Sequence, residues 1–278
     1  MTPPRKMGPL GLPGLAAEFL LSALYPPRCL GCGKFLSISQ GFARLSPERA
    51  GPLLGGGDLL ALLSGWLCNE CQDEVAPVES PICSVCGEVF VSRTGPDRVC
   101  GLCAERRPAF SVARAAGLYE GALARGVQRL KYGGRMELAR PLGYLLQDAY
   151  LRHFADDPPD LVIPVPLHKS RLRERGFNQV MLILADWAGR PELPPVSSRL
   201  MKRVRPTPPQ ASLDRVHRAA SVRKAFSVER PDEVKDRKVL VVDDVYTTGA
   251  TARECAKVLK KAGAARVDVL TLARVTAG

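Results

Sequence analysis

Residues 239–251 have the sequence Val-Leu-Val-Val-Asp-Asp-Val-Tyr-Thr-Thr-Gly-Ala-Thr, and this stretch decides the fold. Its four leading aliphatic residues predict a strand buried on both faces, as in the middle of a parallel sheet. Two adjacent carboxylates and a small loop of hydroxyl residues and glycine follow. From Ala252 the apolar residues recur at helical spacing as far as Gly263, which predicts a helix. This order of strand, acids, loop and helix is typical of an α/β fold.

The loop and the start of the helix are suited to hold a phosphate. Free N–H groups at a helix N-terminus bind anions, and Gly249 lets the backbone come close to the ligand. Further donors are the hydroxyl groups of Thr247, Thr248 and Thr251. Asp243 and Asp244 are placed to accept hydrogen bonds from sugar hydroxyls. No Walker lysine follows the glycine, which argues against a P-loop NTPase, so the pattern predicts a sugar 5-phosphate as ligand.

This stretch resembles the phosphoribosyl-pyrophosphate (PRPP) loop of type I phosphoribosyltransferases. The resemblance implies that the two acids bind the ribose hydroxyls and that the loop binds the 5-phosphate. The alternative is a plain strand-to-helix turn with solvated acids, but the acid pair, the loop and the flanking periodicities all agree with the resemblance. The residues expected to bind PRPP are Asp243, Asp244, Thr247, Thr248, Gly249, Ala250 and Thr251.

Positive charge is concentrated in one part of the chain. The 278 residues include 40 Lys and Arg against 28 Asp and Glu, a net charge of +12. Residues 160–224 alone hold 13 basic and 5 acidic side chains, or +8, whereas residues 1–110 are neutral overall. This distribution favours an anionic partner at a defined place over a uniformly adhesive surface.

The first basic cluster follows a predicted buried strand at 160–166 and precedes a predicted helix at 176–187. It therefore lies at the same carboxyl-end face as the PRPP loop, where open α/β sheets bind ligands. Forked arginine cations suit pyrophosphate oxygens, and a solvated basic loop is the alternative. The residues expected to bind pyrophosphate are Lys169, Arg171, Arg173 and Arg175.

The second basic cluster lies within residues 199–218 and includes Lys202, Arg203 and Arg205. Prolines at 206, 208 and 209 predict a stiff, exposed loop. We expect this loop either to form a lid over the ligand or to contact the backbone of single-stranded DNA, and a merely solvated loop is the third alternative. Because few aromatic residues lie in the basic segment, DNA contacts would be made chiefly to phosphates.

Eight of the nine cysteines form four Cys-x-x-Cys pairs, all before residue 104. Two such pairs complete a tetrahedral Cys₄ zinc site, and without an evident export signal we expect metal ligands rather than disulfides. Sequential pairing is expected; interleaved pairing and redox-active or iron–sulfur cysteines stay open. One or two structural zinc ions would stabilise a segment too small to build a core. The expected ligands are Cys29, Cys32, Cys68, Cys71, Cys83, Cys86, Cys100 and Cys103.

The chain is expected to divide into three parts. These are a tail with a short helix at 1–24, a double zinc-ribbon domain at 25–108 with an insertion at 34–67, and a phosphoribosyltransferase-like domain at 109–278. In the last part strands alternate with helices, which predicts a parallel sheet flanked by helices. We expect no membrane span and a cytoplasmic location, since the apolar stretch near the N-terminus is short and interrupted by Glu18.

The order of these motifs resembles the ComF-type family of competence proteins over about residues 25–275. The Cys-x-x-Cys series is followed by Leu-Lys-Tyr-Gly-Gly at 130–134, by a run ending in Arg-Glu-Arg-Gly-Phe-Asn-Gln at 173–179, and by the acid pair with its threonine loop. The long insertion at 34–67 departs from the family pattern, as do Ala211 and Ser221.

The resemblance implies a protein of type I phosphoribosyltransferase fold that binds Mg²⁺–PRPP and takes part in DNA uptake during natural transformation. It also implies cytosolic helicase or recombination proteins as partners. As an enzyme, the protein would transfer ribosyl phosphate to a nucleophile and release pyrophosphate, with Mg²⁺ held largely by substrate oxygens. The sequence contains no recognisable acceptor-base pocket, so the acceptor stays open. The alternative is that PRPP or a related nucleotide regulates a single-stranded DNA-binding competence factor without turnover.

Overall fold

A computed structural model provides the structure of this chain. It describes residues 27–36, 63, 65–92, 94–187, 190–206 and 220–276. The predicted tail at 1–24, most of the insertion at 34–67 and the proline-rich loop beyond residue 206 lie outside the described residues. Within the described ranges, no helix is both long and apolar enough to cross a membrane.

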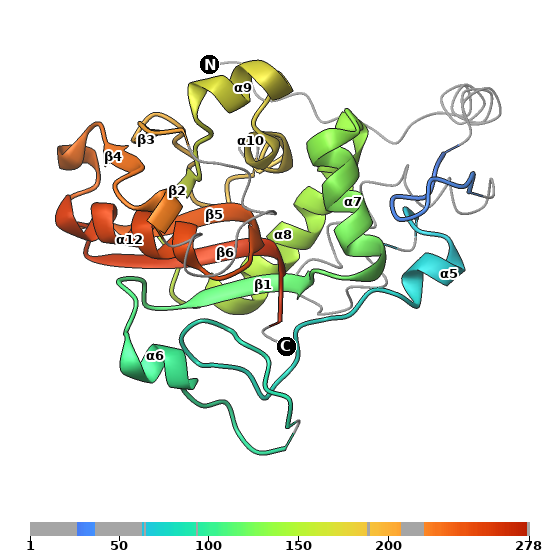
Figure 1. The fold of residues 1–278 in the computed structure, drawn as a ribbon, viewed down its shortest axis with the longest axis horizontal. Coiled ribbons are helices and arrows are strands. Elements are labelled where there is room, and N and C mark those ends of the chain that lie inside the picture. Colours follow the sequence, from blue (N-terminus) through green and yellow to red (C-terminus); the bar gives the residue numbers. More distant parts are fainter. Residues whose placement is uncertain are drawn as a thin grey trace, which may run out of the picture.

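A four-stranded parallel sheet forms the centre of the protein (Figure 1). Its strands are β1 (Ala113–Leu118), β2 (Leu161–Pro164), β5 (Lys238–Tyr246) and β6 (Arg266–Arg274). They lie in the order β1-β6-β5-β2, and every pairing is parallel. The central strands β5 and β6 are aliphatic on both faces, as a sheet covered on both sides requires. The predicted α/β fold, a parallel sheet flanked by helices, is confirmed.

Helices cover both faces of this sheet. The longer ones are α7 (Gly121–Tyr132), α8 (Ala139–Phe154) and α12 (Ala250–Lys261). Because side chains of a strand alternate between faces, β5 contributes to two cores. Leu240 and Val242 pack with α7 and α8, whereas Val239 and Val241 pack on the other face with α12.

Shorter elements complete the described structure. They are α5 (Asn69–Gln72), α6 (Gly101–Glu105), η1 (Met136–Leu138), α9 (Lys169–Arg175), α10 (Gln179–Ile183), β3 (Met201–Arg203), β4 (Phe226–Val228) and η3 (Pro231–Glu233). Strands β3 and β4 form a separate antiparallel pair, which lies beside α12.

Two element boundaries differ from the prediction. The strand predicted at 239–242 continues through both acids to Tyr246, because β5 pairs with β6 over that whole length. The helix predicted at 176–187 is shorter than expected, since α10 covers only Gln179–Ile183, and the basic cluster before it forms a separate short helix, α9. The side chain of Asn178 accepts a hydrogen bond from the Val180 N–H and so caps α10.

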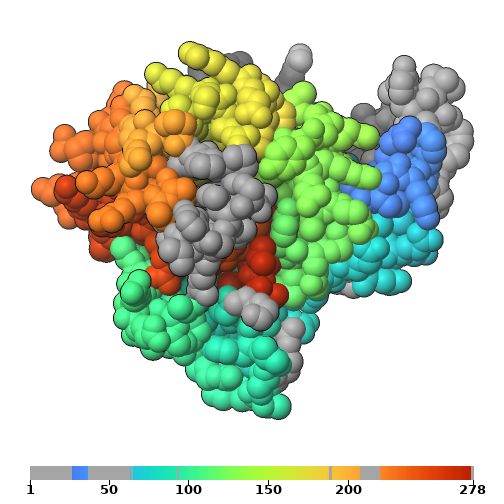
Figure 2. Space-filling view, in the orientation of Figure 1, coloured from blue at the N-terminus to red at the C-terminus, as the bar shows by residue number. Residues whose placement is uncertain are grey.

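The two cysteine-rich segments pack against opposite faces of the sheet. Cys29 and Cys71 belong to the core shared with α7 and α8. Cys83 and Cys103 belong to the core shared with α12. Figure 1 shows α5 beside α7 and α6 beyond β1, and in Figure 2 the two segments occupy separate parts of the surface. The domain boundary at residue 108 stays a prediction.

Helix α7 rests closely on the first of these segments. A Cβ added to Gly126 would lie 2.3 Å from a methyl carbon of Leu30, so a larger residue here would require the buried Leu30 side chain to move. One turn further along, Arg129 donates a hydrogen bond of 2.8 Å to the carbonyl oxygen of Cys32. The amino-terminal cysteine segment therefore fixes the position of α7, whose last turn reaches the site described next.

Candidate functional site

The threonine loop, residues 247–251, comprises the turn that joins β5 to α12 at the carboxyl end of the sheet and the first two residues of α12. Gly249 has a φ of 73°, and an added Cβ would lie 2.2 Å from the hydroxyl of Tyr246. Both the left-handed backbone and the close approach therefore require glycine. The loop is further held by a hydrogen bond of 3.4 Å from the Ala250 N–H to the Thr248 hydroxyl.

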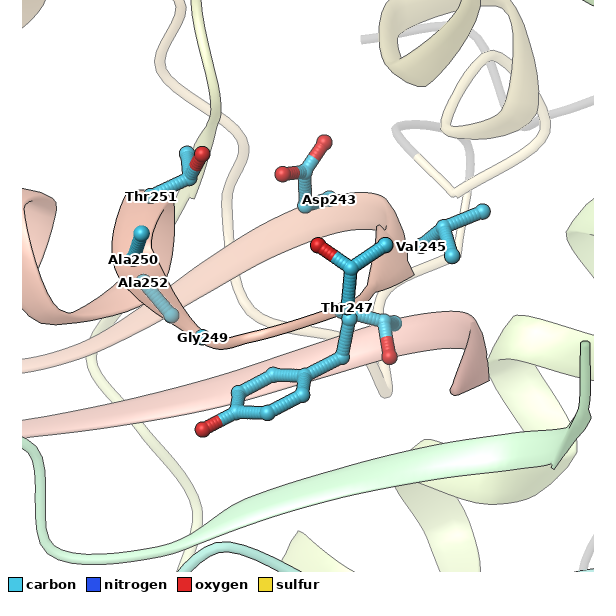
Figure 3. A pocket seen from close by; sticks show the side chains of 9 residues that line it. Asp243, Val245, Thr247, Gly249, Ala250, Thr251 and Ala252 are labelled. Carbon is cyan, nitrogen blue, oxygen red and sulfur yellow. The ribbon is translucent and has the colours of Figure 1, made fainter. Parts of the chain in front are cut away.

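A small pocket lies over this turn. Its lining residues are Asp243, Val245, Tyr246, Thr247, Gly249, Ala250, Thr251, Ala252 and Thr271. Figure 3 shows the side chains of Asp243 and Thr251 projecting on the same side of the loop. The first turn of α12 adds N–H groups that have no partner within the helix. A carboxylate, hydroxyl groups and a helix N-terminus thus converge here; the helix N-terminus and the hydroxyls suit an anion such as phosphate, and the carboxylate can accept hydrogen bonds.

The two adjacent acids have different surroundings. Asp243 faces the pocket, and one of its oxygens accepts a hydrogen bond of 2.9 Å from the Asp244 N–H. Burial, and then the negative charge of Asp244, raise the pKa of Asp243 to about 7. Asp244 is buried and does not line the pocket. Its carboxylate is engaged by Lys131 and by the side-chain amide of Gln179.

Lys131, in the last turn of α7, is a site residue to which the sequence analysis assigns no role. Its Nζ lies 2.8 Å from Oδ1 of Asp244, with the two side chains only 15% and 8% exposed. Burial opposes the charge of this lysine, but the neighbouring carboxylates, Asp244 first and Asp243 after it, raise its pKa. The available signal was its place in the Leu-Lys-Tyr-Gly-Gly motif; its partner, 113 positions away in the sequence, is identified only by the fold.

Arg175 connects the first basic cluster to the acid pair. It donates a hydrogen bond to Oε1 of Gln179, whose amide group in turn donates to Asp244. The guanidinium of Arg175 also lies over the ring of Tyr132, 5.1 Å from its centroid. Three motifs that are far apart in the sequence therefore meet around one carboxylate.

The other members of this cluster lie on the surface of α9. Arg171 forms an ion pair of 3.1 Å with Glu174, while Lys169 and Arg173 are exposed. His168 caps the helix by accepting a hydrogen bond of 3.3 Å from the Ser170 N–H. The role of Lys169, Arg171 and Arg173 in binding pyrophosphate stays a prediction.

Residues Lys202, Arg203 and Arg205 of the second basic cluster lie in three different surroundings. Lys202 is exposed and pairs with Glu229. Arg205 is also exposed and donates a hydrogen bond of 3.2 Å to the carbonyl oxygen of Arg223.

Arg203, by contrast, turns inward. Its guanidinium carbon lies 5.3 Å from the ring centroid of Phe226. Burial lowers the pKa of Arg203, and the nearby charge of Asp243 opposes that effect. Arg203 therefore belongs electrostatically to the acid site, whereas Lys202 and Arg205 face solvent.

The cysteines form two compact Cys₄ groups. The first cysteine cluster is Cys29, Cys32, Cys68 and Cys71, and the second is Cys83, Cys86, Cys100 and Cys103; within each, the sulfur atoms lie within 4.8 Å of one another. Pairing is therefore sequential rather than interleaved. The sulfurs of Cys32 and Cys68, and those of Cys86 and Cys100, are 3.7 Å apart. A tetrahedron with Zn–S bonds of about 2.3 Å has edges of about 3.8 Å, so both groups fit zinc.

Backbone amides prepare one sulfur of each cluster to act as a thiolate ligand. The N–H groups of Cys86 and Cys100 donate to the sulfur of Cys83 at 3.4 and 3.3 Å. Burial alone would raise the pKa of Cys83, but these hydrogen bonds lower it to about 7. In the first cluster, the Cys68 N–H donates to the sulfur of Cys29 in the same way, at 3.4 Å. Such N–H···S bonds fit a structural metal site, which requires deprotonated thiols.

This chain is similar to one domain family and to proteins that are named for competence or for DNA utilization. Residues 172–278 match the phosphoribosyl transferase domain family. The chain is 32% identical to competence protein F of Haemophilus influenzae, over 77% of this chain and 93% of that protein. It is 33% identical to DNA utilization protein YhgH of Salmonella typhimurium, over 75% and 96% of the two chains. It is 25% identical to competence protein ComFC of Bacillus subtilis, over 75% and 84%.

Proposed function

Because this chain belongs to the ComF family of competence proteins and contains a phosphoribosyl transferase domain, we propose that it binds Mg²⁺–PRPP at the threonine loop and serves in DNA uptake. The relatives are named for competence and for DNA utilization, and we extend that role to this chain. The observation that carries the ligand assignment is the Asp243 carboxylate beside the threonine loop and the N-terminus of α12.

In the proposed complex, the N-terminus of α12 and the hydroxyls of Thr247 and Thr251 hold the 5-phosphate of the ligand. Asp243 accepts hydrogen bonds from the ribose hydroxyls in its ionised form. Its carboxylate oxygens also suit Mg²⁺, a hard cation that prefers oxygen ligands and is held mainly by the substrate phosphates. When bound, Mg²⁺ supplies neutralisation of the pyrophosphate charge.

Asp244 takes a supporting part in this proposal. Lys131 and Gln179 engage its carboxylate away from the pocket. The charge of Lys131 also partly offsets the repulsion between the two acids, which favours ionisation of Asp243. We assign neutralisation of the pyrophosphate to Lys169, Arg171, Arg173 and Arg175 on α9. Turnover would then require a nucleophile at C1 of the ribose, whose identity stays open.

Calorimetry with Mg–PRPP tests the ligand assignment. Asp243→Asn keeps the shape of the side chain but removes a charged acceptor. Hydrogen bonds to charged groups contribute about 1.5–3 kcal/mol, so affinity should fall roughly 10- to 150-fold. Asp232→Asn, an exposed acid on η3, is the matched control and should bind as the wild type does. Unchanged affinity in Asp243→Asn would refute the assignment, and release of pyrophosphate with a panel of bases would identify turnover.

A second function, binding of single-stranded DNA, is favoured by the exposed cations of the +8 segment. Lys169, Arg173, Lys202 and Arg205 all face solvent, in contrast to Arg203. Contacts of this kind would be made to phosphates, so binding would tolerate any sequence and weaken steeply with salt. Titration of a labelled oligonucleotide at two salt concentrations tests this function, and no detectable binding at low salt would exclude it.

A further inference from the structure

The second cysteine cluster contacts the structure beneath and beside the threonine loop through two arginines. Arg274, the last residue of β6, is only 2% exposed. Its Nη1 donates a hydrogen bond of 2.7 Å to the carbonyl oxygen of Cys86, and its Nη2 pairs with Glu88. The turn that carries Cys86 is therefore fixed to the end of a central strand.

Arg274 also contacts Tyr246, which lines the pocket. The guanidinium carbon lies 5.2 Å from the ring centroid of Tyr246, its neighbour in the β5–β6 register. Phe110 packs edge-on against the same ring, with centroids 6.5 Å apart. Gly249 lies directly against the Tyr246 hydroxyl. The position of this ring therefore determines where the loop backbone lies.

A separate contact reaches the other flank of the loop. Arg253, in the first turn of α12, donates from Nη1 to the carbonyl oxygen of Arg106 at 2.9 Å. Its Nη2 lies 3.9 Å from the sulfur of Cys103. The backbone N–H of the same residue donates to the carbonyl oxygen of Gly249 at 2.8 Å. One residue thus joins a cysteine of the cluster to the glycine of the loop.

We propose that the metal-loaded second cysteine cluster positions the threonine loop for its phosphate ligand, with Arg253 and Arg274 as the positioning residues. Zinc at Cys83, Cys86, Cys100 and Cys103 fixes the backbone carbonyls and the sulfur that these arginines contact. Binding of the metal then raises the affinity for the phosphate ligand, and binding of the ligand raises the affinity for the metal by the same factor. The ligand part of this inference rests on the proposed function, but the ordering of the loop does not.

Hydrogen exchange tests the ordering without any ligand. Arg253→Met removes both side-chain contacts but keeps a comparable helix propensity. Arg125→Met is the matched control, because Arg125 of α7 contacts Cys71 of the first cluster in a similar way, at 3.4 Å. Both variants should retain two zinc ions. Amides 247–253 should exchange about tenfold faster in Arg253→Met and at the wild-type rate in Arg125→Met.

Reciprocity gives the second measurement, with Mg–PRPP as the probe and a colorimetric chelator as the zinc acceptor. Saturating Mg–PRPP should slow release of one of the two zinc ions from the wild type by about tenfold, within the range usual for coupled sites. Arg253→Met should lose this protection, and Arg125→Met should keep it. If Mg–PRPP does not bind the wild type at all, the proposed function fails, and the exchange result still decides the inference. Wild-type exchange of amides 247–253 in Arg253→Met would overturn it.

Discussion

Replacement of Lys131 by methionine should destabilise the protein by an amount that the geometry allows us to work out. The Nζ of Lys131 lies 2.8 Å from Oδ1 of Asp244, and both side chains are largely buried. Two unit charges at that distance attract by about 6 kcal/mol at an effective dielectric constant of about 20. Desolvation offsets most of this attraction, but removal of only one partner leaves a buried charge, which costs about 3–5 kcal/mol.

The expected loss lies near the lower end of that range. Gln179 still donates its amide to Asp244 in the variant, so the carboxylate keeps one partner. A loss of about 3 kcal/mol corresponds to a decrease in Tm of roughly 6–12 °C for a domain of this size. Urea unfolding followed by circular dichroism measures the free energy, and thermal unfolding measures the Tm. Lys257→Met, an exposed lysine of α12, is the matched control and should unfold like the wild type.

A double-mutant cycle separates this ion pair from other effects of the substitution. Asp244→Asn removes the buried charge, so Lys131→Met should cost much less in that background. The difference should be about 1–3 kcal/mol, as is usual for residues in one buried network. The reasoning is refuted if Lys131→Met lies within about 0.5 kcal/mol of the control, or if its cost is the same with and without the Asp244 carboxylate.

Three further predictions concern metal, pH and DNA. Mass spectrometry of the native protein should find two zinc ions per chain, and Cys32→Ala or Cys86→Ala should each leave one; iron, or no metal, would contradict the assignment of the Cys₄ groups. Because the pKa of Asp243 is raised to about 7, the folded state holds a proton there that the unfolded chain releases near pH 4. The contribution of Asp243 to the free energy of unfolding should therefore fall from pH 4 to 7, and Mg–PRPP affinity should rise from pH 6 to 8. Urea unfolding and calorimetry across this range check both trends as the difference between the wild type and Asp243→Asn. Lys202→Glu with Arg205→Glu should weaken oligonucleotide binding and lower the slope of log K against log salt by about 1.4, two phosphate contacts in all; an unchanged slope would place the DNA elsewhere.

The parallel sheet and the threonine loop could be predicted from the sequence because each depends on local patterns. The aliphatic run at 239–242 predicts a buried strand, and the glycine at 249 predicts a tight turn, each from only a few neighbouring residues. The full length of β5 could not be predicted in this way, since acids are rare in strands and only the pairing with β6 shows that the strand continues to Tyr246.

The partners of the acid pair could not be predicted for a related reason. Lys131 and Gln179 reach Asp244 from different helices, so no spacing in the sequence links them. Lys202 and Arg203 are adjacent in the sequence and are therefore expected to act together. Adjacent residues of a strand point to opposite sides, however. Arg203 lies over the Phe226 ring and within the influence of the Asp243 charge, whereas Lys202 pairs with Glu229.

Helix α7 acts as a spacer of fixed length, and this restricts which insertions and deletions the chain tolerates. Its Gly126 is seated on Leu30, and Lys131, five residues later, meets Asp244. Deletion of one residue between these two points would rotate the lysine by about 100° and move it by about 1.5 Å, away from the carboxylate. Insertion of a whole turn would restore the angle but overshoot by about 5.4 Å. Length changes between positions 126 and 131 should therefore be absent from functional members of the family, whatever substitutions they accept.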